Sequence, residues 1–442
     1  METNIDMMGW KEAKLRDLIC DFKRGIAYSS EDISSPNGIP MMNLASIDKT
    51  GYYREGEMKF YSGRYDEADK IYPDEMLIAC TDLTRDAIII GTPIKVPNES
   101  DFFLFTMDLA KLRPNDCIDP DFMYYALKTN TYRKYIKPWA SGTNVLHLNL
   151  NGVYNYTLKY PVSKNAQKSI ARILLNIDKK IAINKRINHY LEAMAKQLYD
   201  YWFVQFDFPD ANGNPYKSSG GKMIWNEKLR REIPEGWEDC TLGRYVGRIT
   251  NGLNPRKNFT LGHGNNYYVT IRSLLGTDID WDNCDRCDDE ALTKINSRSQ
   301  LTQGDVIFSA IGTIGRTFYI QDFPSNWNIS ETSFTLRAAE SIPSDLFYCI
   351  LRSAEIQRQA DKNAMGSTLR CLVMDSLLKI PYIWIPENLR VQYAKFVRPI
   401  LKQINELNKS TRQLIMLRNE TMLVLMNGQV SVKQLNNDLS HD

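Results

Sequence analysis

The hydrophobic positions of the first 160 residues fall in short runs that turn-forming residues interrupt. Met76 to Ala79, Ala87 to Ile90 and Phe102 to Phe105 are compact apolar runs bounded by Pro, Gly, Asp and Asn, a pattern typical of buried strands. Between Asp121 and Tyr135 the apolar residues instead recur at helical spacing. This region therefore predicts an α+β domain of about 150 residues, an ordinary domain size.

The same plan returns in the second half of the chain. Gly9-Trp10 falls on Gly236-Trp237 at an offset of 227 residues, and Gly142-Thr143 falls on Gly366-Ser367 at an offset of 224. The apolar run from Val306 to Ser309 parallels that from Met76. A period of more than 200 residues is far longer than the roughly 20–50 residues of solenoid repeats. We therefore expect two homologous domains whose side chains differ while their spacing persists.

A long helix is predicted after each domain. Seam residues recur at alternating spacings of four and three, from Ile170 to Trp202 and from Val397 to Leu425, which is the heptad signature of a coiled coil. A helix with one apolar stripe needs a partner, and the obvious partner is the other copy. The residues expected to pair the helices are Leu174, Ile177, Ile181, Leu191, Leu198, Val397, Ile400, Ile404, Leu407 and Leu414. Helices of some 40 residues would form a rod of about 60 Å.

Particular residues qualify this coiled-coil prediction. Ser163 is placed to cap the start of the first helix. Asn184 and Asn188 fall in its seam, where polar groups cost stability but fix register. Pro399 should kink the second helix or mark its true start. The alternative is two amphipathic helices that each pack on their own domain.

The predicted fold class is α+β: two homologous globular domains separated by two long antiparallel helices that form a coiled-coil spacer, with a pseudo-twofold internal repeat. One domain is expected near each end of the rod. The expected boundaries are 1–162 and 236–386 for the domains, 163–208 and 387–427 for the helices, 209–235 for a linker and 428–442 for a C-terminal tail.

Composition limits the partners and the compartment. Lys and Arg (55) exceed Asp and Glu (53) by only two, so any nucleic-acid surface must be a local basic face. The eight cysteines are scattered and are expected to be reduced thiols. Residues 1–11 contain no apolar leader segment, and no apolar run approaches the ~20 residues of a membrane span. We expect a cytoplasmic protein.

No catalytic or metal-binding constellation is recognisable. Asn214-Pro215-Tyr216 lacks one Pro of the Asn/Asp-Pro-Pro-aromatic loop that methylates exocyclic amines, and Gly221-Lys222 lacks the leading Gly and the Ser or Thr of a phosphate-binding loop. Cys284 and Cys287 form a lone CxxC, whereas structural zinc needs four ligands. Residues 278–282 begin like a calcium loop but lack its glycine and its bidentate Glu. We expect no catalytic residue and no metal or cofactor site.

The segment between the first helix and the second domain is the most specific stretch of the chain. Tyr201 to Pro209 reads YWFVQFDFP, Gly213 to Met223 reads GNPYKSSGGKM, and Arg231 to Trp237 reads REIPEGW. These motifs resemble the central region of the specificity subunits of type I restriction–modification systems. The order of domain, helix, domain and helix is also similar to that family's, so the resemblance covers essentially the whole chain.

The resemblance implies a subunit that reads DNA and does no chemistry itself. Two target-recognition domains would read the two halves of a bipartite site in which adenine is methylated. Two methyltransferase subunits would dock on the helices and supply the S-adenosylmethionine site. Restriction subunits would add the ATP- and Mg-dependent translocase and the nuclease. The chain itself would carry no cofactor.

Sequence readout needs side chains that reach base edges, backed by phosphate contacts, and loops at matching places in the two domains carry such residues. The candidates in the first domain are Arg85, Lys134, Lys137, Asn144 and His147. Those in the second domain are Arg256, Lys257, Arg272, Arg316, Thr368 and Arg370. Each one alone is equally compatible with a solvated surface residue. Because the loops differ, an asymmetric target is expected, with half-sites about one helical turn apart or a multiple of it.

A non-catalytic, two-headed protein-interaction scaffold with a coiled-coil spacer is the alternative function. The small net charge permits it. Salt separates the two hypotheses, because DNA binding through phosphates weakens steeply with ionic strength, whereas an apolar protein interface need not.

Overall fold

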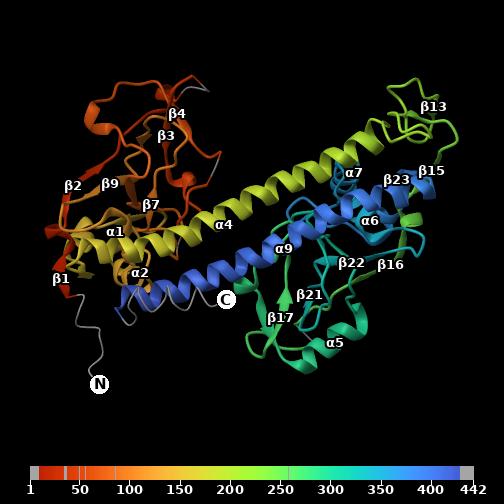
Figure 1. Cartoon of the computed structure of the whole chain (residues 1–442). Coiled ribbons are helices and arrows are strands. Elements are labelled where there is room, and N and C mark those ends of the chain that lie inside the picture. Colours follow the sequence, from red (N-terminus) through yellow and green to blue (C-terminus); the bar gives the residue numbers. More distant parts are fainter. Residues whose placement is uncertain are drawn as a thin grey trace. The chain divides into compact units, whose positions relative to one another are not determined.

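The computed structural model describes residues 9–33, 37–48, 50–54, 56–84, 86–256 and 258–428. The chain forms two compact units, of which the first combines two segments far apart in the sequence and the second is one continuous segment. Unit 1 comprises Met1–Ile181 together with Gln413–Asp442, and unit 2 comprises Ala182–Arg412 (Figure 1). Each unit therefore contains one globule and a stretch of both long helices.

The globule of unit 1 is built around two antiparallel-rich sheets and a strand pair. The four-stranded sheet has the order β2-β9-β5-β7, and the three-stranded sheet has the order β4-β3-β8 with β3 and β8 parallel. A separate pair joins β1 to β12. The strands are β1 (Trp10–Lys14), β2 (Ile19–Arg24), β3 (Ile39–Met42), β4 (Lys59–Tyr61), β5 (Met76–Ala79), β7 (Pro93–Lys95), β8 (Leu104–Phe105), β9 (Leu109–Pro114) and β12 (Thr157–Pro161).

The globule of unit 2 has the same sheet topology. Its four-stranded sheet has the order β16-β22-β19-β20, its three-stranded sheet the order β18-β17-β21 with β17 and β21 parallel, and β15 pairs with β23. The strands are β15 (Glu238–Thr241), β16 (Val246–Asn251), β17 (Asn266–Val269), β18 (Asp285–Cys287), β19 (Val306–Ser309), β20 (Thr317–Tyr319), β21 (Trp327–Ile329), β22 (Ser333–Ala338) and β23 (Pro381–Trp384). The agreement, including the single parallel pair, confirms the predicted duplication.

Short helices cover the sheets, and the long predicted helix of each globule is broken in two. The sequence between Asp121 and Tyr135 forms two helices. The Thr129 hydroxyl accepts a hydrogen bond from the Tyr132 amide and so caps the start of the second helix. Ser353 does the same in unit 2, accepting from the Ile356 amide. These helices are α1 (Pro120–Ala126), α2 (Asn130–Ile136), α3 (Leu150–Asn155), α5 (Asp289–Ser299), α6 (Ser344–Arg352), α7 (Ala354–Asn363) and α8 (Met374–Leu378).

The run from Ala87 to Ile90 is not the strand that its apolar side chains predicted. It forms turns, with Ala87 at φ 50°, and its carbonyl groups point to a cation. The Arg133 guanidinium donates to the carbonyl oxygens of Ala87 at 3.3 Å, Ile88 at 2.7 Å and Ile90. The apolar side chains of this run therefore indicated burial but not strand conformation. Hydrogen bonds from Arg133, which is distant in the sequence, stabilise the turns instead.

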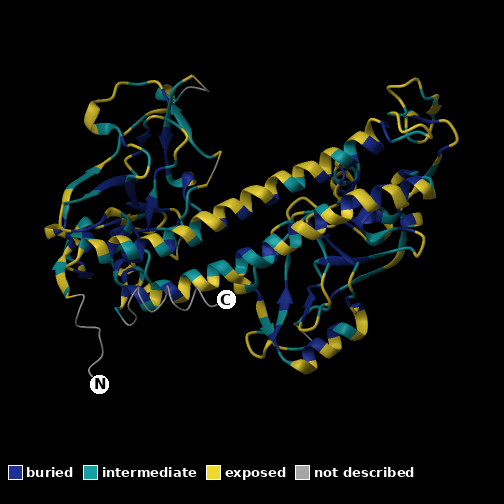
Figure 2. Cartoon of the chain, viewed as in Figure 1, coloured by how far each residue is buried: buried dark blue, intermediate teal, exposed yellow. Residues whose placement is uncertain are grey.

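Two long helices, α4 (Lys164–Tyr199) and α9 (Glu387–Met426), run antiparallel within each unit. In unit 1, Asp178 of α4 pairs with Arg418 of α9 at 3.0 Å. In unit 2, Asn188 donates to Asn408 at 2.6 Å, and Asn184, one turn earlier in α4, donates to Ser410. Buried positions on both helices alternate with exposed ones (Figure 2). The predicted α+β fold with two long antiparallel helices is confirmed.

The helix termini and seam differ in detail from the sequence pattern. Ser163 accepts a hydrogen bond from the Ala166 amide at 3.4 Å, as the expected cap. Helix α9 begins at Glu387, so Pro399 lies inside the helix and does not mark its start. Beyond Val397 the most buried positions of α9 include Leu401 and Asn408, whereas their predicted neighbours Ile400 and Leu407 are half-buried. A 3.6-residue helix drifts against a strict heptad, which accounts for this one-residue shift.

The other residues expected to pair the helices lie at the following levels of burial. Leu174, Ile181, Val397 and Ile404 are buried. Ile177, Leu191, Leu198 and Leu414 are half-buried. Asn184 and Asn188 are buried in the same seam, and their amides have the partners given above.

Between α4 and the globule of unit 2, the chain forms a compact cluster of aromatic side chains. A single π-helical turn (Asp200–Val204) ends α4. Phe208 stacks on Tyr216 with ring centroids 4.8 Å apart and on Trp237 at 5.2 Å. The Asp207 carboxylate accepts from the amide and hydroxyl of Ser218 at 2.7 and 2.6 Å, which lowers its pKa through those hydrogen bonds. The hairpin β13 (Met223–Asn226) and β14 (Arg231–Pro234) completes the segment.

Leu174→Ala is expected to destabilise unit 1, because Leu174 is fully buried among residues of α1, α9 and the globule. Deleting three buried carbons typically costs about 2–5 kcal/mol in the free energy of unfolding. Urea denaturation followed by circular dichroism measures it. Ile183→Ala, which removes the same kind of surface from an exposed position of α4, is the matched control and should change the midpoint little. Equal effects of the two substitutions would contradict the assigned packing.

Candidate nucleic-acid interface

In unit 1 the predicted DNA-contacting residues gather around one small sheet of order β10-β11-β6. His147 of β11 (Leu146–Leu148) pairs with Ser141 of β10 (Ala140–Ser141) and with Thr81 of β6 (Thr81–Asp82). Asn144 lies exposed in the β10–β11 turn, and His147 is also exposed. The strand β6 leads directly into the loop of residues 83–90. The hairpin and that loop therefore form one surface.

The end of α2 adds basic groups to this surface. Lys134 and Lys137 are both exposed, and the Lys137 ammonium donates to the Asp86 carbonyl at 3.3 Å. The loop itself is held by the Asp82 carboxylate, which accepts from the amides of Ile89 at 2.7 Å and Ile90 at 3.1 Å. Arg85, predicted for the same loop, lies outside the described residues.

Unit 2 repeats this arrangement with different side chains. Cys371 bridges both Ile311 and Met365, so the order Met365, Cys371 and Ile311 matches the order β10-β11-β6 of unit 1. The Gly312 amide donates to the Arg370 carbonyl at 2.8 Å. The loop after β19 therefore lies against the turn that carries Thr368, which is exposed.

Arg316 joins a third loop to this surface. Its Nη1 donates to the carbonyl oxygens of Ile271 at 3.0 Å and Leu274 at 3.4 Å. Arg272 lies between these two carbonyls in the sequence and its side chain is exposed. Arg316 thus has backbone partners and positions the turn that presents Arg272. The structure brings Arg272, Arg316 and the 365–371 turn together.

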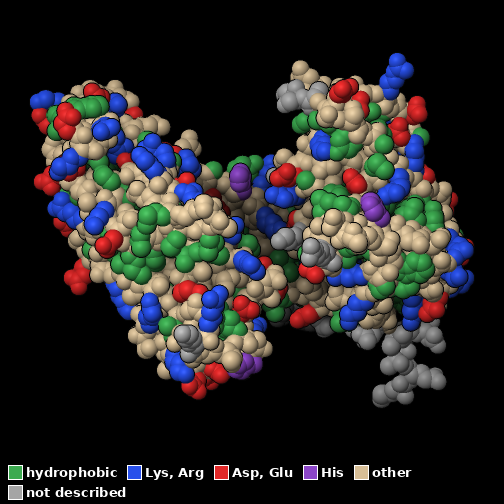
Figure 3. All heavy atoms as spheres, turned by 180° about the vertical axis from the view of Figure 1, so that it is seen from behind, with side chains coloured by type: hydrophobic (Ala, Val, Ile, Leu, Met, Phe, Trp, Pro, Cys, Tyr) green, Lys and Arg blue, Asp and Glu red, His purple; other side chains and the backbone are tan. Residues whose placement is uncertain are grey.

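Other predicted residues are less free than the sequence suggested. Arg370 forms an ion pair with Asp361 of α7 and also donates to the Asp361 carbonyl. Arg256 is exposed in a turn whose Asn254 donates to Glu331 at 2.8 Å. Lys257 lies outside the described residues. On the face drawn in Figure 3, Lys and Arg side chains are interspersed with Asp and Glu, in line with the small net charge.

Sequence reasoning missed the exposed apolar residues of the same loops. Leu83 in unit 1 is 67% exposed, and Met365 and Leu369 in unit 2 are each 64% exposed. Apolar side chains at such positions can contact thymine methyl groups, so they belong to the candidate surface. A sequence alone gives no sign of them, because an apolar residue in a loop is ordinarily taken as packed.

The structure gives the cysteine and acidic motifs the following surroundings. All eight cysteines are free thiols, and Cys284 and Cys287 are buried among apolar residues, which raises the pKa of both thiols. Across the described part of the chain, no group of three or more His, Cys, Asp or Glu is arranged to hold a metal ion. Asp278 instead forms an ion pair with Arg412 of α9; burial raises the pKa of its carboxyl, and Arg412 opposes that rise.

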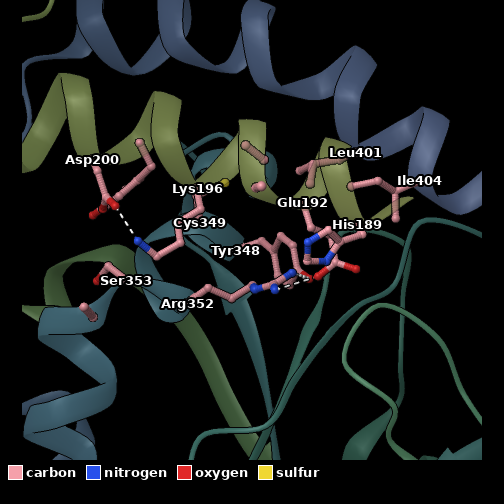
Figure 4. Close-up of a pocket in the computed structure, with 14 residues that line it drawn as sticks. His189, Glu192, Lys196, Asp200, Tyr348, Cys349, Arg352, Ser353, Leu401 and Ile404 are labelled. Atoms are coloured by element: carbon pink, nitrogen blue, oxygen red, sulfur yellow. Dashed lines mark hydrogen bonds and ion pairs between the residues drawn. The ribbon is translucent and has the colours of Figure 1, made fainter. Parts of the chain in front are cut away.

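A second kind of site lies where each globule meets the helices. In unit 2 a cavity of about 470 Å³ lies between α4, α9 and the junction of α6 with α7 (Figure 4). Arg352 reaches from α6 to the Glu192 carboxylate of α4 at 3.0 Å and to the Tyr348 hydroxyl at 2.7 Å. The wall of this cavity includes the apolar side chains of Leu401 and Ile404.

Comparisons with known proteins bear on this architecture. Residues 7–193 match the model of the type I restriction modification DNA specificity domain. The MjaIX specificity subunit of Methanocaldococcus jannaschii is 24% identical over 325 residues, which is 73% of this chain and 72% of the relative. The HindI specificity subunit of Haemophilus influenzae is 31% identical over 121 residues, 26% of each chain.

The crystal structure of a type I restriction–modification S subunit from M. genitalium has the same fold, with a TM-score of 0.58 at 18% identity over 96% of this chain and 98% of that one. Residues 7–193 thus match the type I restriction modification DNA specificity domain, and the chain is similar in sequence to two type I specificity subunits. Among the described residues, no helix is long and apolar enough to cross a membrane.

Arg316→Ala is expected to loosen the turn that carries Arg272. Two charge-assisted hydrogen bonds to backbone carbonyls are lost, and each is ordinarily worth about 1.5–3 kcal/mol. The amides of Ser273 and Leu274, which close this turn, should exchange with deuterium at least about tenfold faster. Arg272→Ala removes an exposed cation from the same turn and should leave their exchange unchanged. Unaltered exchange in Arg316→Ala would show that Arg316 does not position the turn.

Proposed function

We propose that this chain is the non-catalytic specificity subunit of a type I restriction–modification system and that it reads an asymmetric bipartite DNA target, with unit 1 contacting one half-site and unit 2 the other. The main support is that two globules of the same topology present unlike side chains at matching positions. Asn144 of unit 1 corresponds to Thr368 of unit 2, and His147, which pairs with Ser141, corresponds to Cys371, which bridges Met365. Two domains with the same backbone topology but different side chains at matching positions are suited to recognise different bases.

The proposed domain boundaries follow the expectation from the sequence. Residues 1–162 and 236–386 are the proposed target-recognition domains, and 163–208 and 387–427 the conserved helices. Residues 209–235 form the proposed linker and 428–442 the tail. The chain would bind no cofactor itself, and S-adenosylmethionine, ATP and Mg²⁺ would belong to methyltransferase and restriction subunits. The proposed compartment is the cytoplasm, where the host DNA lies.

Within each surface we propose a division of labour between phosphate and base contacts. Arg272, held by Arg316, is the best-placed base-reading residue of unit 2, because its side chain is exposed while its turn is fixed. Lys134 and Lys137 stand at the end of a helix with exposed ammonium groups and suit phosphate contacts. Phosphate contacts set orientation and affinity, whereas only base contacts specify the sequence.

Arg272→Ala is expected to relax the target at one base pair in one half-site and to leave the other half-site unchanged. A lost side-chain contact to a base edge costs about 1–3 kcal/mol of discrimination. The readout is a map of methylated adenines in cells that express the chain with its methyltransferase subunits. Lys402→Ala, which removes an exposed cation from α9 of the same unit, should leave the map unchanged. An Arg272→Ala map identical to wild type, or altered in both halves, would contradict this role.

The helices also offer a surface for partner subunits. On α4, Ile183, Ile187, Tyr190 and Met194 recur at spacings of four, three and four and are between 40% and 57% exposed. An apolar stripe at heptad spacing on a helix that already buries another face suits a further helix or a protein groove. We propose that a methyltransferase subunit docks along this stripe.

Met194→Asp is expected to weaken association with the methyltransferase subunit at least about tenfold, because a charge would be buried in an apolar contact. Co-purification and a pull-down titration with that subunit measure the loss. Lys185→Asp introduces the same carboxylate about half a turn around the helix and serves as the control. Loss of binding in both variants, or in neither, would argue against docking on this stripe.

The protein-interaction scaffold is the weaker candidate, and ionic strength separates it from DNA reading. If phosphate contacts supply the binding energy, the affinity for the mapped duplex should fall steeply as the salt concentration rises. The logarithm of the association constant should then fall linearly with the logarithm of the salt concentration.

A further inference from the structure

The internal duplication places two related cavities at the two junctions between globule and helices. The cavity of unit 2 is lined by Arg352 and Ser353 at the break between α6 and α7 (Figure 4). The cavity of unit 1, of about 450 Å³, is lined by Lys128 and Thr129 at the break between α1 and α2. The two pairs correspond in the sequence at the offset of 224, so each cavity has a cation at the same place in the fold.

The two cations differ in how their charge is compensated. In unit 2 the Arg352 guanidinium has the Glu192 carboxylate at 3.0 Å. In unit 1 the helix position equivalent to Glu192, at an offset of 223, is Ile415, which has no charge to offer. The unit 1 cavity therefore keeps the cation of its twin but not the anion.

Lys128 is held by neutral groups. Its ammonium donates to the Gly51 carbonyl at 2.8 Å and lies 3.1 Å from the centroid of the Tyr52 ring. Gly51 has φ 77°, and a Cβ there would lie 2.3 Å from Cγ2 of Thr92, so this turn requires glycine. Among the described residues, no carboxylate forms an ion pair with Lys128 within 4 Å.

The Asp178 carboxylate near Lys128 already has other hydrogen-bond partners. Asp178 accepts from Arg418 at 3.0 Å, from the Tyr125 hydroxyl at 2.8 Å and from the Tyr52 hydroxyl at 3.2 Å. This ion pair neutralises Arg418, which also lines the cavity. Lys128 itself has no ion pair within 4 Å among the described residues.

A second cation of the cavity is in the same condition. Arg133 of α2 lines the cavity, and the three hydrogen bonds described above all go to neutral backbone carbonyls. No ion pair of Arg133 within 4 Å occurs in the part of the chain that the structure describes. Glu420 is the one acidic side chain among the residues lining the cavity, and it is solvent-exposed. Neither of these two partly buried cations thus has an ion-pair partner within 4 Å among the described residues.

We propose that the unit 1 cavity is a binding site for a phosphate dianion, the terminal phosphate of a free phosphate-bearing molecule. Two uncompensated cations match two negative charges better than the single charge of a carboxylate. Thr131 and Asn130 add further polar groups at the same wall, and Met422, Leu423 and Met426 form an apolar wall. A phosphate joined to an apolar or planar body fits this mixed lining.

The protonation of Lys128 provides a readout of the site. Burial lowers the pKa of its ammonium to about 7, Asp178 opposes that shift, and Arg418 adds to it. The charged and titratable groups that face Lys128 from the surrounding elements are Asp48, Tyr52, Tyr124, Arg133, Asp178 and Arg418. A bound dianion favours the charged form and therefore raises this pKa. Above pH 7, binding must then be accompanied by proton uptake.

The test is isothermal titration of the full-length chain with inorganic phosphate, at constant ionic strength set with chloride. Wild type should bind saturably. Lys128→Gln should weaken the affinity at least about tenfold, while Lys168→Gln, at an exposed position of α4 in the same unit, should bind as wild type does. The proposal is overturned if wild type gives no saturable binding, or if Lys128→Gln binds with wild-type affinity.

A wild-type measurement decides the matter should Lys128→Gln fail to fold. At pH 8.5, titrations in two buffers of different ionisation enthalpy should report uptake approaching one proton per phosphate bound, because Lys128 is then mostly neutral in the unliganded protein. Binding without proton uptake would overturn the site assignment.

Duplex DNA separates this site from a contact with the DNA backbone, whose phosphodiesters carry one negative charge each. Lys128→Gln should leave the slope of log K against log salt for the duplex unchanged. A slope lowered by about one would place a backbone phosphate in the cavity and would overturn the assignment to a dianion. The titration with inorganic phosphate involves no DNA, so its outcome is independent of whether the two units read a bipartite target.

Discussion

The ion pair between Asp178 and Arg418 is the contact on which unit 1 most depends. The two side chains come from helices more than 200 residues apart in the sequence and are only 13% and 12% exposed. A buried carboxylate is tolerated when its lone pairs are filled, and here two tyrosine hydroxyls from the globule fill those that Arg418 leaves. One carboxylate thus joins both helices to the globule. Removing either partner would strand a charge in the interior, which typically costs about 3–5 kcal/mol.

Unit 2 solves the same problem with different residues. Asn188 and Asn408 pair in the helix seam, and Asn408 also donates to the Thr277 carbonyl of the globule at 2.8 Å. Thr277 in turn donates to Glu192, the partner of Arg352. In both units, polar contacts fix how the globule sits on the helices, while apolar burial supplies most of the driving force. Such contacts specify register, because a shift of one residue along either helix would leave buried polar groups unpaired.

The sequence predicted the periodic parts of this structure well. Helical spacing and duplication are properties of a chain read by itself, so the two long helices and the repeated globule could be found from it. The breaks at Thr129 and Ser353 could have been suspected from their capping side chains, but the apolar spacing continues across both. The turns at Ala87 to Ile90 could not, because a distant arginine decides them. Contacts between remote residues lie outside any local pattern.

The same limit applies to the candidate interface. A basic residue in a loop was taken as available for DNA, yet Arg316 and Arg370 are engaged by backbone carbonyls and by Asp361, whereas Arg272 is exposed. The sequence predicted loops at paired positions of a duplicated chain, and the contact of these loops with DNA stays a prediction. The sequence could not separate the loop residues whose side chains are exposed from those whose side chains hold the loop backbone in place. That difference depends on which neighbouring groups each side chain contacts.

Duplication also explains how one fold came to hold two chemically different junctions. Each copy must keep the helix break and its cation, because Lys128 and Arg352 both stand where a globule meets the helices. The compensating acid is not part of that requirement: it lies on a helix in unit 2 and is absent from the matching position in unit 1. An uncompensated cation in a cavity costs free energy unless the fold gains something by keeping it. In unit 2 that cost has been removed with a glutamate. Its persistence in unit 1, where Ile415 stands at the position that matches Glu192, is the physical reason to regard that cavity as a site rather than a packing defect.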